Sequence, residues 1–141
     1  MLGKLSVAVV TCALATVSCQ GGDVDTASGS VSLSGSLGGV QAEIFDKSCS
    51  TVACHRGSSP AGGLTLEPGK AHDALVDVPA LMAPGKRLVV PGHPDHSFLM
   101  EKLRGHLSQD EGLPMPYAKP PLSAAQIGLV EQWIAGGATA D

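Results

Sequence analysis

Large side chains are scarce in this chain of 141 residues. It has one Trp, one Tyr and two Phe, against 18 Gly and 10 Pro. A small domain with so few large apolar side chains builds only a modest core, and it would gain from a buried apolar cofactor. Basic residues are also in the minority, with nine against 13 acidic residues and a formal net charge of −4. This balance argues against nucleic acid as a partner.

The sequence also lacks an apolar run long enough to span a bilayer. Near its start, an apolar run over residues 5–15 follows Lys4, and this length and order are typical of a signal peptide. The run leads to Thr16-Val17-Ser18-Cys19, which resembles a bacterial lipobox. We therefore expect residues 1–18 to be removed and Cys19 to be lipidated. The protein would then be tethered on the periplasmic side of a bacterial membrane or at the cell surface. Cleavage after Ala15 is the alternative and would leave it unlipidated.

A segment without helical or strand periodicity follows the lipid site. Residues 20–38 consist largely of Gly, Ser, Asp and Val, a composition typical of a flexible tether. We therefore divide the mature chain into a tether over residues 19–38 and one domain over residues 39–141. That domain has about 100 residues, which is enough for a single small core.

Cysteines are few, and most of their roles can be assigned. Cys12 lies in the signal segment and Cys19 at the lipid site, which leaves Cys49 and Cys54 in the domain, with His55 directly after Cys54. Two thiols followed by an imidazole are typical of covalent haem attachment, although the usual spacing is two residues and here it is four. Each thiol can add to one haem vinyl group while the histidine binds the iron. A disulfide remains the alternative, and a zinc site would lack ligands.

The residues after His55 form a glycine-rich stretch that lets the backbone approach a flat group closely. If haem binds here, we expect a backbone carbonyl near Pro60 to accept the N–H of the other ring nitrogen of His55, as partners of metal-bound histidines do. We also expect Arg56 to pair with a haem propionate. The alternative for Arg56 is an exposed side chain with no specific partner.

Helical periodicity and helix-end signals predict four helices. The last has the clearest start, because Ser123 and Gln126 form a capping box and Leu122 and Ile127 a hydrophobic staple. The predicted ranges are 40–47, 68–76, 94–104 and 124–135. No run alternates apolar and polar residues, so the predicted fold class is mostly α, with long irregular connections.

One connection is unusually long. Residues 106–121 carry no periodicity, and a structureless loop of that length in a small domain is normally functional. Within it, Met115 lies between Pro114 and Pro116, which stiffen the backbone on both sides. The thioether of Met115 can therefore be held in one place.

The order of these parts resembles a class I c-type cytochrome: an N-terminal helix, a thioether motif with histidine, a wrapping loop, a methionine loop and a C-terminal helix. Phe45 and Trp133 match the aromatic positions at which the terminal helices cross in that family. More narrowly, Val89-Val90-Pro91-Gly92, Leu113-Pro114-Met115-Pro116 and residues 122–136 resemble planctomycete-type cytochrome c domains of exported bacterial proteins. The resemblance covers nearly all of residues 39–137.

This resemblance implies a small cytochrome c-like helical domain whose loops surround one covalent haem c. The iron would bind His55 on one face and Met115 on the other. The competing ligands for the second position are Met100, His93, His96 and His106. With both positions filled, the function is electron transfer to redox partner proteins in the cell envelope, without enzymatic turnover. Without Met115 as a ligand, an open iron could bind ligands or act as a peroxidase. Without haem, the chain would be a disulfide-stapled interaction module.

Overall fold

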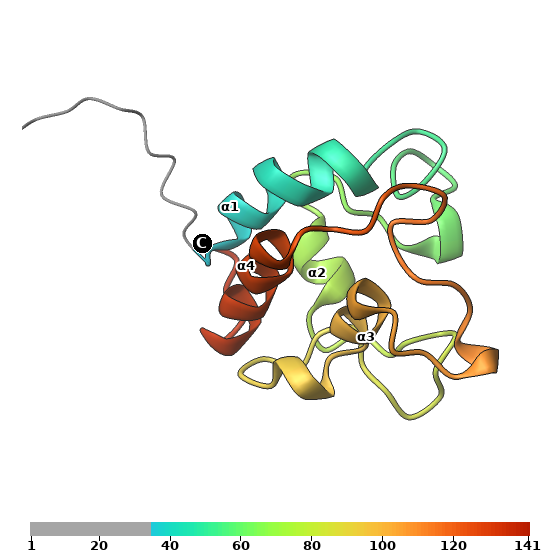
Figure 1. Ribbon diagram of the computed structural model, residues 1–141. Coiled ribbons are helices and arrows are strands. Elements are labelled where there is room, and N and C mark those ends of the chain that lie inside the picture. Colours follow the sequence, from blue (N-terminus) through green and yellow to red (C-terminus); the bar gives the residue numbers. More distant parts are fainter. Residues whose placement is uncertain (1–34) are drawn as a thin grey trace, which may run out of the picture. The chain divides into compact units, whose positions relative to one another are not determined.

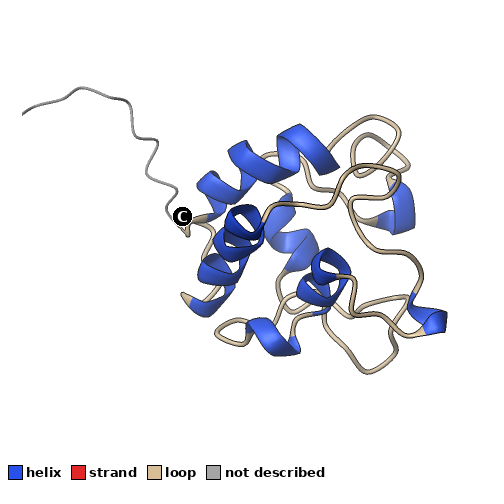
Figure 2. Ribbon diagram, in the orientation of Figure 1, coloured by secondary structure: helices blue, strands red, loops and turns tan. Residues whose placement is uncertain are grey.

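The computed structural model describes residues 35–141, which belong to one compact unit. The predicted signal peptide, the lipid site at Cys19 and most of the predicted tether lie outside this range. Within it the chain is mostly helical and has no strand, which confirms the predicted mostly α class (Figure 2). None of its helices has the length and apolar character needed to cross a membrane.

The N-terminal helix begins earlier than predicted. Helix α1 (Leu37–Val40) continues into the π-helix η1 (Gln41–Cys49). Its start is stabilised by Ser36, whose Oγ accepts the N–H of Gly39 at 3.1 Å. The carboxylate of Asp141 also accepts the N–H groups of Leu37 (2.9 Å) and Gly38. The helix therefore begins within the range that was predicted as the end of the tether. Asp141, which accepts these N–H groups, lies at the other end of the sequence, so no pattern near residue 37 predicts this helix start.

The C-terminal helix α4 (Ala124–Ala135) has the bounds that its sequence predicts. The capping box is formed, because the N–H of Gln126 donates to Ser123 Oγ at 3.2 Å and the N–H of Ser123 donates to Gln126 Oε1 at 3.0 Å. Leu122 and Ile127 both pack against the core, as the staple requires. Every signal for this helix is local, which explains why sequence alone predicts it.

The two terminal helices contact each other, and the main core lies at this contact (Figure 1). Phe45 and Trp133 are both buried in it, and Trp133 Nε1 donates to the carbonyl of Thr139 at 2.9 Å. Gly35 lies where the chain passes α4 closely, because a Cβ built there would be 2.6 Å from Cβ of Gln132. Only glycine fits that approach without a shift of the backbone.

Helix α2 (Ala71–Leu75) is shorter than the predicted range of 68–76. Residues 68–70 form a turn in which Gly69 has a φ of +74°, so the helix begins only after it. The buried side chains of Ala71 and Leu75 join the core. After α2, the chain pairs with later residues only through isolated bridges, such as the one between Val76 and Val89.

The predicted third helix is broken at Ser97. The 3₁₀-helix η3 (Pro94–His96) precedes the break and helix α3 (Phe98–Arg104) follows it, while Ser97 is extended. Its buried Oγ accepts the N–H of Val90 at 2.9 Å and donates to the carbonyl of His93 at 2.9 Å. These bonds compete with helical geometry at this position. Two further 3₁₀-helices lie in the loops, η2 (Ala61–Gly63) and η4 (Gln109–Glu111).

The close approach at Gly35 leads to a test with a matched control. We expect Gly35→Ala to lower the free energy of unfolding by about 1–3 kcal/mol, because its new methyl group overlaps α4. Gly128→Ala, inside α4, meets no atom within 4 Å. It should raise the free energy of unfolding by about 0.5–1 kcal/mol through helix propensity. Urea denaturation measures both, and equal effects of the two variants would contradict the assigned crossing.

Candidate functional site

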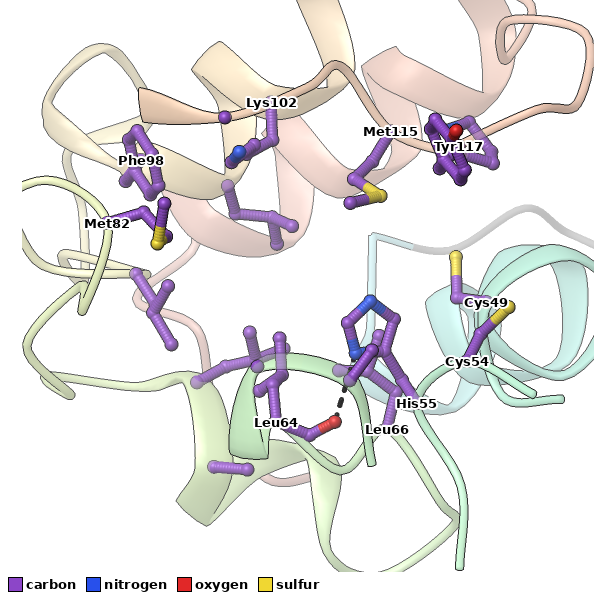
Figure 3. Close-up of a pocket in the computed structure, with 18 of the residues that line it drawn as sticks. Cys49, Cys54, His55, Leu64, Leu66, Met82, Phe98, Lys102, Met115 and Tyr117 are labelled. Carbon is purple, nitrogen blue, oxygen red and sulfur yellow. Dashed lines mark hydrogen bonds between the residues drawn. The ribbon is translucent and has the colours of Figure 1, made fainter. Parts of the chain in front are cut away.

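A large apolar cavity lies between the cysteine motif and the methionine loop (Figure 3). Its volume is about 850 Å³, which is within the range of cofactor pockets. One end is formed by the last turn of η1 and the cysteine motif, and the other by α3 and residues 78–82. Residues 61–66 and α2 line one side, and residues 112–119 the opposite side. No Asp or Glu is among the lining residues, so the cavity favours an apolar occupant.

The two cysteines of the motif both line the cavity as free thiols. Cys49 is buried at the end of η1, and Cys54 is half-buried. The four residues between them fold into a tight turn, because the N–H groups of Thr51 (3.0 Å) and His55 (3.2 Å) both donate to the carbonyl of Cys49. The side chain of Val52 is 84% exposed. Val52 and Ala53 are therefore exposed while Ser50 is buried, and both thiols stay on one cavity wall. The disulfide that sequence left open is not formed.

The imidazole of His55 is held by a carbonyl in the manner of a metal-bound histidine, but the carbonyl differs from the predicted one. Nδ1 lies 3.0 Å from the carbonyl oxygen of Leu64. A carbonyl only accepts, so Nδ1 carries the proton and Nε2 is left as the basic nitrogen. Nε2 points into the cavity (Figure 3). The carbonyl was expected near Pro60 and comes from Leu64, directly after the glycine-rich stretch, while the carbonyl of Pro60 accepts the N–H of Gly63 at 2.9 Å.

Arg56 does not reach the cavity. Its side chain is exposed, and Nε lies 3.5 Å from a carboxylate oxygen of Glu67. Glu67 also accepts from Lys70 at 2.9 Å, and that hydrogen bond lowers the pKa of Glu67. In the structure Arg56 is thus paired with Glu67, and its pairing with a haem propionate stays a prediction. Glu67 lies only 11 residues further along the chain, and its carboxylate forms an ion pair with Arg56 at the surface.

Met115 lies across the cavity from His55, with its thioether directed inward (Figure 3). Its N–H donates to the carbonyl of Lys102 at 2.9 Å, which joins the methionine loop to α3. The competing ligands do not line the cavity. Met100 is buried in the core, while the three histidines are exposed outside the cavity: His93, His96 and His106. Among the predicted ligand candidates, the structure brings only Met115 into the cavity with His55.

An ion-pair network holds the start of the methionine loop. Lys86 Nζ lies 2.6 Å from Oε1 of Glu111 and also donates to Glu101. Glu111 is buried, and its carboxylate accepts the N–H of Ser108 at 2.8 Å. The hydrogen bond from Lys86 lowers the pKa of Glu111. Charges that are partly removed from water and mutually paired hold a loop in one position, so the segment leading to Met115 is tied to α3.

Met82 and Lys102 are lining residues that no sequence motif identifies. Met82 lines the cavity at the end away from the thiols, and so does Lys102 (Figure 3). Met82 lies in a connection without periodicity, and Lys102 reads in the sequence as an ordinary helix lysine. Neither position carries a local signal of its role.

The described residues contain no cluster of three or more His, Cys, Asp or Glu side chains that could hold a metal ion by themselves. A zinc site built on the cysteine pair thus has too few ligands in this part of the chain. An iron bound here would need ligands from a cofactor in addition to His55 and Met115. Comparison with known proteins finds no match: no family model, no curated protein and no solved structure is similar to the chain.

The burial of Cys49 has a measurable consequence in chain produced without haem. Burial raises the pKa of Cys49 from 9.0 to about 11, so its thiol stays protonated at neutral pH. In Cys54→Ser, in which Cys49 is the one cysteine left in the domain, we expect the rate of alkylation of Cys49 by iodoacetamide to rise about tenfold per pH unit beyond pH 9. In denaturant, the same variant should level off near pH 9. Mass spectrometry measures both rates, and a plateau near pH 9 in the folded chain would contradict the buried thiol.

Proposed function

We propose that this chain is an exported monohaem c-type cytochrome that transfers electrons. The observation that carries the proposal is the grouping in one apolar cavity of two free thiols, a histidine with a free Nε2 and a facing methionine thioether. Met115 comes from a loop 60 residues after His55. This grouping of a histidine nitrogen and a thioether sulfur from distant parts of the chain would let both bind one haem iron.

The residues fit haem in three respects. Cys49 and Cys54 lie on one wall, where each thiol can add across one vinyl group, forming a C–S bond and passing its hydrogen to a vinyl carbon. His55 is locked by Leu64 in the tautomer that leaves Nε2 to bind iron. The lining is largely apolar, as a porphyrin ring requires, and it brings one nitrogen and one thioether sulfur into the same cavity as candidate iron ligands.

When bound, the haem would supply a one-electron couple. Met115 would be the second residue to bind the iron, and its thioether would raise the reduction potential relative to a second histidine. The hydrogen bond from Met115 N–H to Lys102 and the Lys86–Glu111 pair hold the loop that carries the thioether. A closed site favours electron transfer over enzymatic turnover. An exported chain would exchange electrons with partner proteins in the cell envelope, tethered through Cys19.

The first experiment asks whether haem is attached. The full chain is expressed with a bacterial haem-attachment system, and the exported protein is stained for haem after denaturation. We expect covalent haem in the wild-type chain and none in the Cys49→Ser/Cys54→Ser double variant. Each single variant should retain one thioether and still stain. A wild-type chain without covalent haem, matured beside a control cytochrome that stains, would contradict the proposal.

The second experiment asks whether Met115 binds the iron. Met115→Ala should lose the methionine-to-iron charge-transfer band of the oxidised protein and lower its reduction potential. Met82→Ala is the matched control, because Met82 lines the same cavity but lies away from His55 (Figure 3). It should keep the band. An unchanged spectrum in Met115→Ala would leave the iron with another ligand or an open position, and the latter would support ligand binding or peroxidase-like turnover.

A further inference from the structure

Two lysines line the cavity, and they lie at opposite ends. Lys119 Nζ donates to the carbonyl of Ser48 at 3.0 Å, so Lys119 lies at the thiol end, beside Cys49. Lys102 lies on α3 beside Phe98, at the end away from the thiols (Figure 3). His55 and Met115 lie between these two ends. Each lysine therefore marks one end of the cavity.

The ammonium group of Lys102 has only neutral hydrogen-bond partners in the described part of the chain. It donates to the carbonyl of Glu111 and, at 3.2 Å, to that of Leu113. An ammonium group has three N–H donors, so these two carbonyls leave one donor for another acceptor. Its Nζ lies 5.2 Å from the centre of the Phe98 ring, close to the apolar lining.

Lys86 provides an internal comparison. Its Nζ lies 5.5 Å from the centre of the same Phe98 ring, yet it is paired with two carboxylates, those of Glu101 and Glu111. Hydrogen bonds to Glu101 and Glu111 raise the pKa of Lys86, whereas burial lowers the pKa of Lys102 against the weaker opposing effect of Glu111. The positive charge of Lys86 is therefore paired with carboxylates of the protein, whereas Lys102, which lines the cavity, has no carboxylate as a hydrogen-bond partner in the described part of the chain.

We propose that Lys102 binds a propionate carboxylate of the haem. This inference rests on the proposed function and assigns a role to Lys102 that Arg56 was expected to have. Haem carries its two vinyl groups and its two propionates on opposite edges of the ring. Attachment of the vinyl groups at Cys49 and Cys54 turns the propionates toward the Lys102 end. There the free donor of Lys102 meets a carboxylate in an apolar setting, where a charge-assisted hydrogen bond is strong.

The test uses the haem-loaded full chain. Lys102→Gln removes the charge but keeps amide donors for the two carbonyls, and Lys119→Gln removes the same charge at the other end. The reduction potential of each is followed against pH by spectroelectrochemistry. A nearby cation lowers the pKa of a carboxyl group, so its loss raises that pKa. In Lys102→Gln the inflection from propionate ionisation should move up by about one pH unit or more, while Lys119→Gln should leave it near the wild-type position.

Equal inflections in the two variants would overturn the role of Lys102 while leaving the haem proposal intact. A wild-type chain that carries no haem would instead contradict the proposed function itself, so the two failures are distinguishable. Infrared spectra of wild-type protein with ¹³C-labelled propionates cover the case in which Lys102→Gln does not mature. At pH 5 they should show at least one ionised propionate, and two protonated propionates would overturn the inference.

Discussion

The contact between the terminal helices is the constraint on which the rest of the structure depends. It joins α1 to α4, which carries the buried Trp133, and it includes the close approach that Gly35 permits. Helix η1 runs from this contact to Cys49, and α4 begins just after the loop that carries Met115. The contact between the terminal helices therefore sets the position of two sides of the cavity: the end of η1, with the thiols, and the loop that carries Met115. A shift at the crossing would move these two sides of the cavity relative to each other.

The scarcity of large side chains and the size of the cavity belong together. A chain with two Phe, one Tyr and one Trp cannot fill the space between its loops with its own side chains, and a cavity of about 850 Å³ lies among them. Apolar residues line it from η1, α2, α3 and the loops between elements, and polar groups are few. A flat apolar cofactor with two carboxylates matches this distribution. Its ring would meet the apolar lining, and its charged edge would meet Lys102.

The features of the fold that sequence predicts well are those that depend on interactions between residues close together in the chain. Helix α4 was predicted to the residue because its cap and staple lie within the helix and its first flanking residues. The break at Ser97 was missed because it depends on a hydrogen bond from Val90, and the start of α1 because it depends on Asp141. In the site, the ligand candidate His55 came from the cysteine motif, and Met115 came from the order of parts that resembles a class I c-type cytochrome. The carbonyl that orients His55 depends on the path of a glycine-rich loop, which no periodicity describes.

The central claim is that Cys49 and Cys54 both hold one haem despite their wide spacing. Intact mass and thiol counting of the exported protein test it most directly, with alkylation in denaturant before and after reduction. The account predicts the added mass of one haem and no alkylation at Cys49 or Cys54 under either condition. A chain without the added mass, in which both thiols become reactive only after reduction, would be a disulfide protein and would contradict the account.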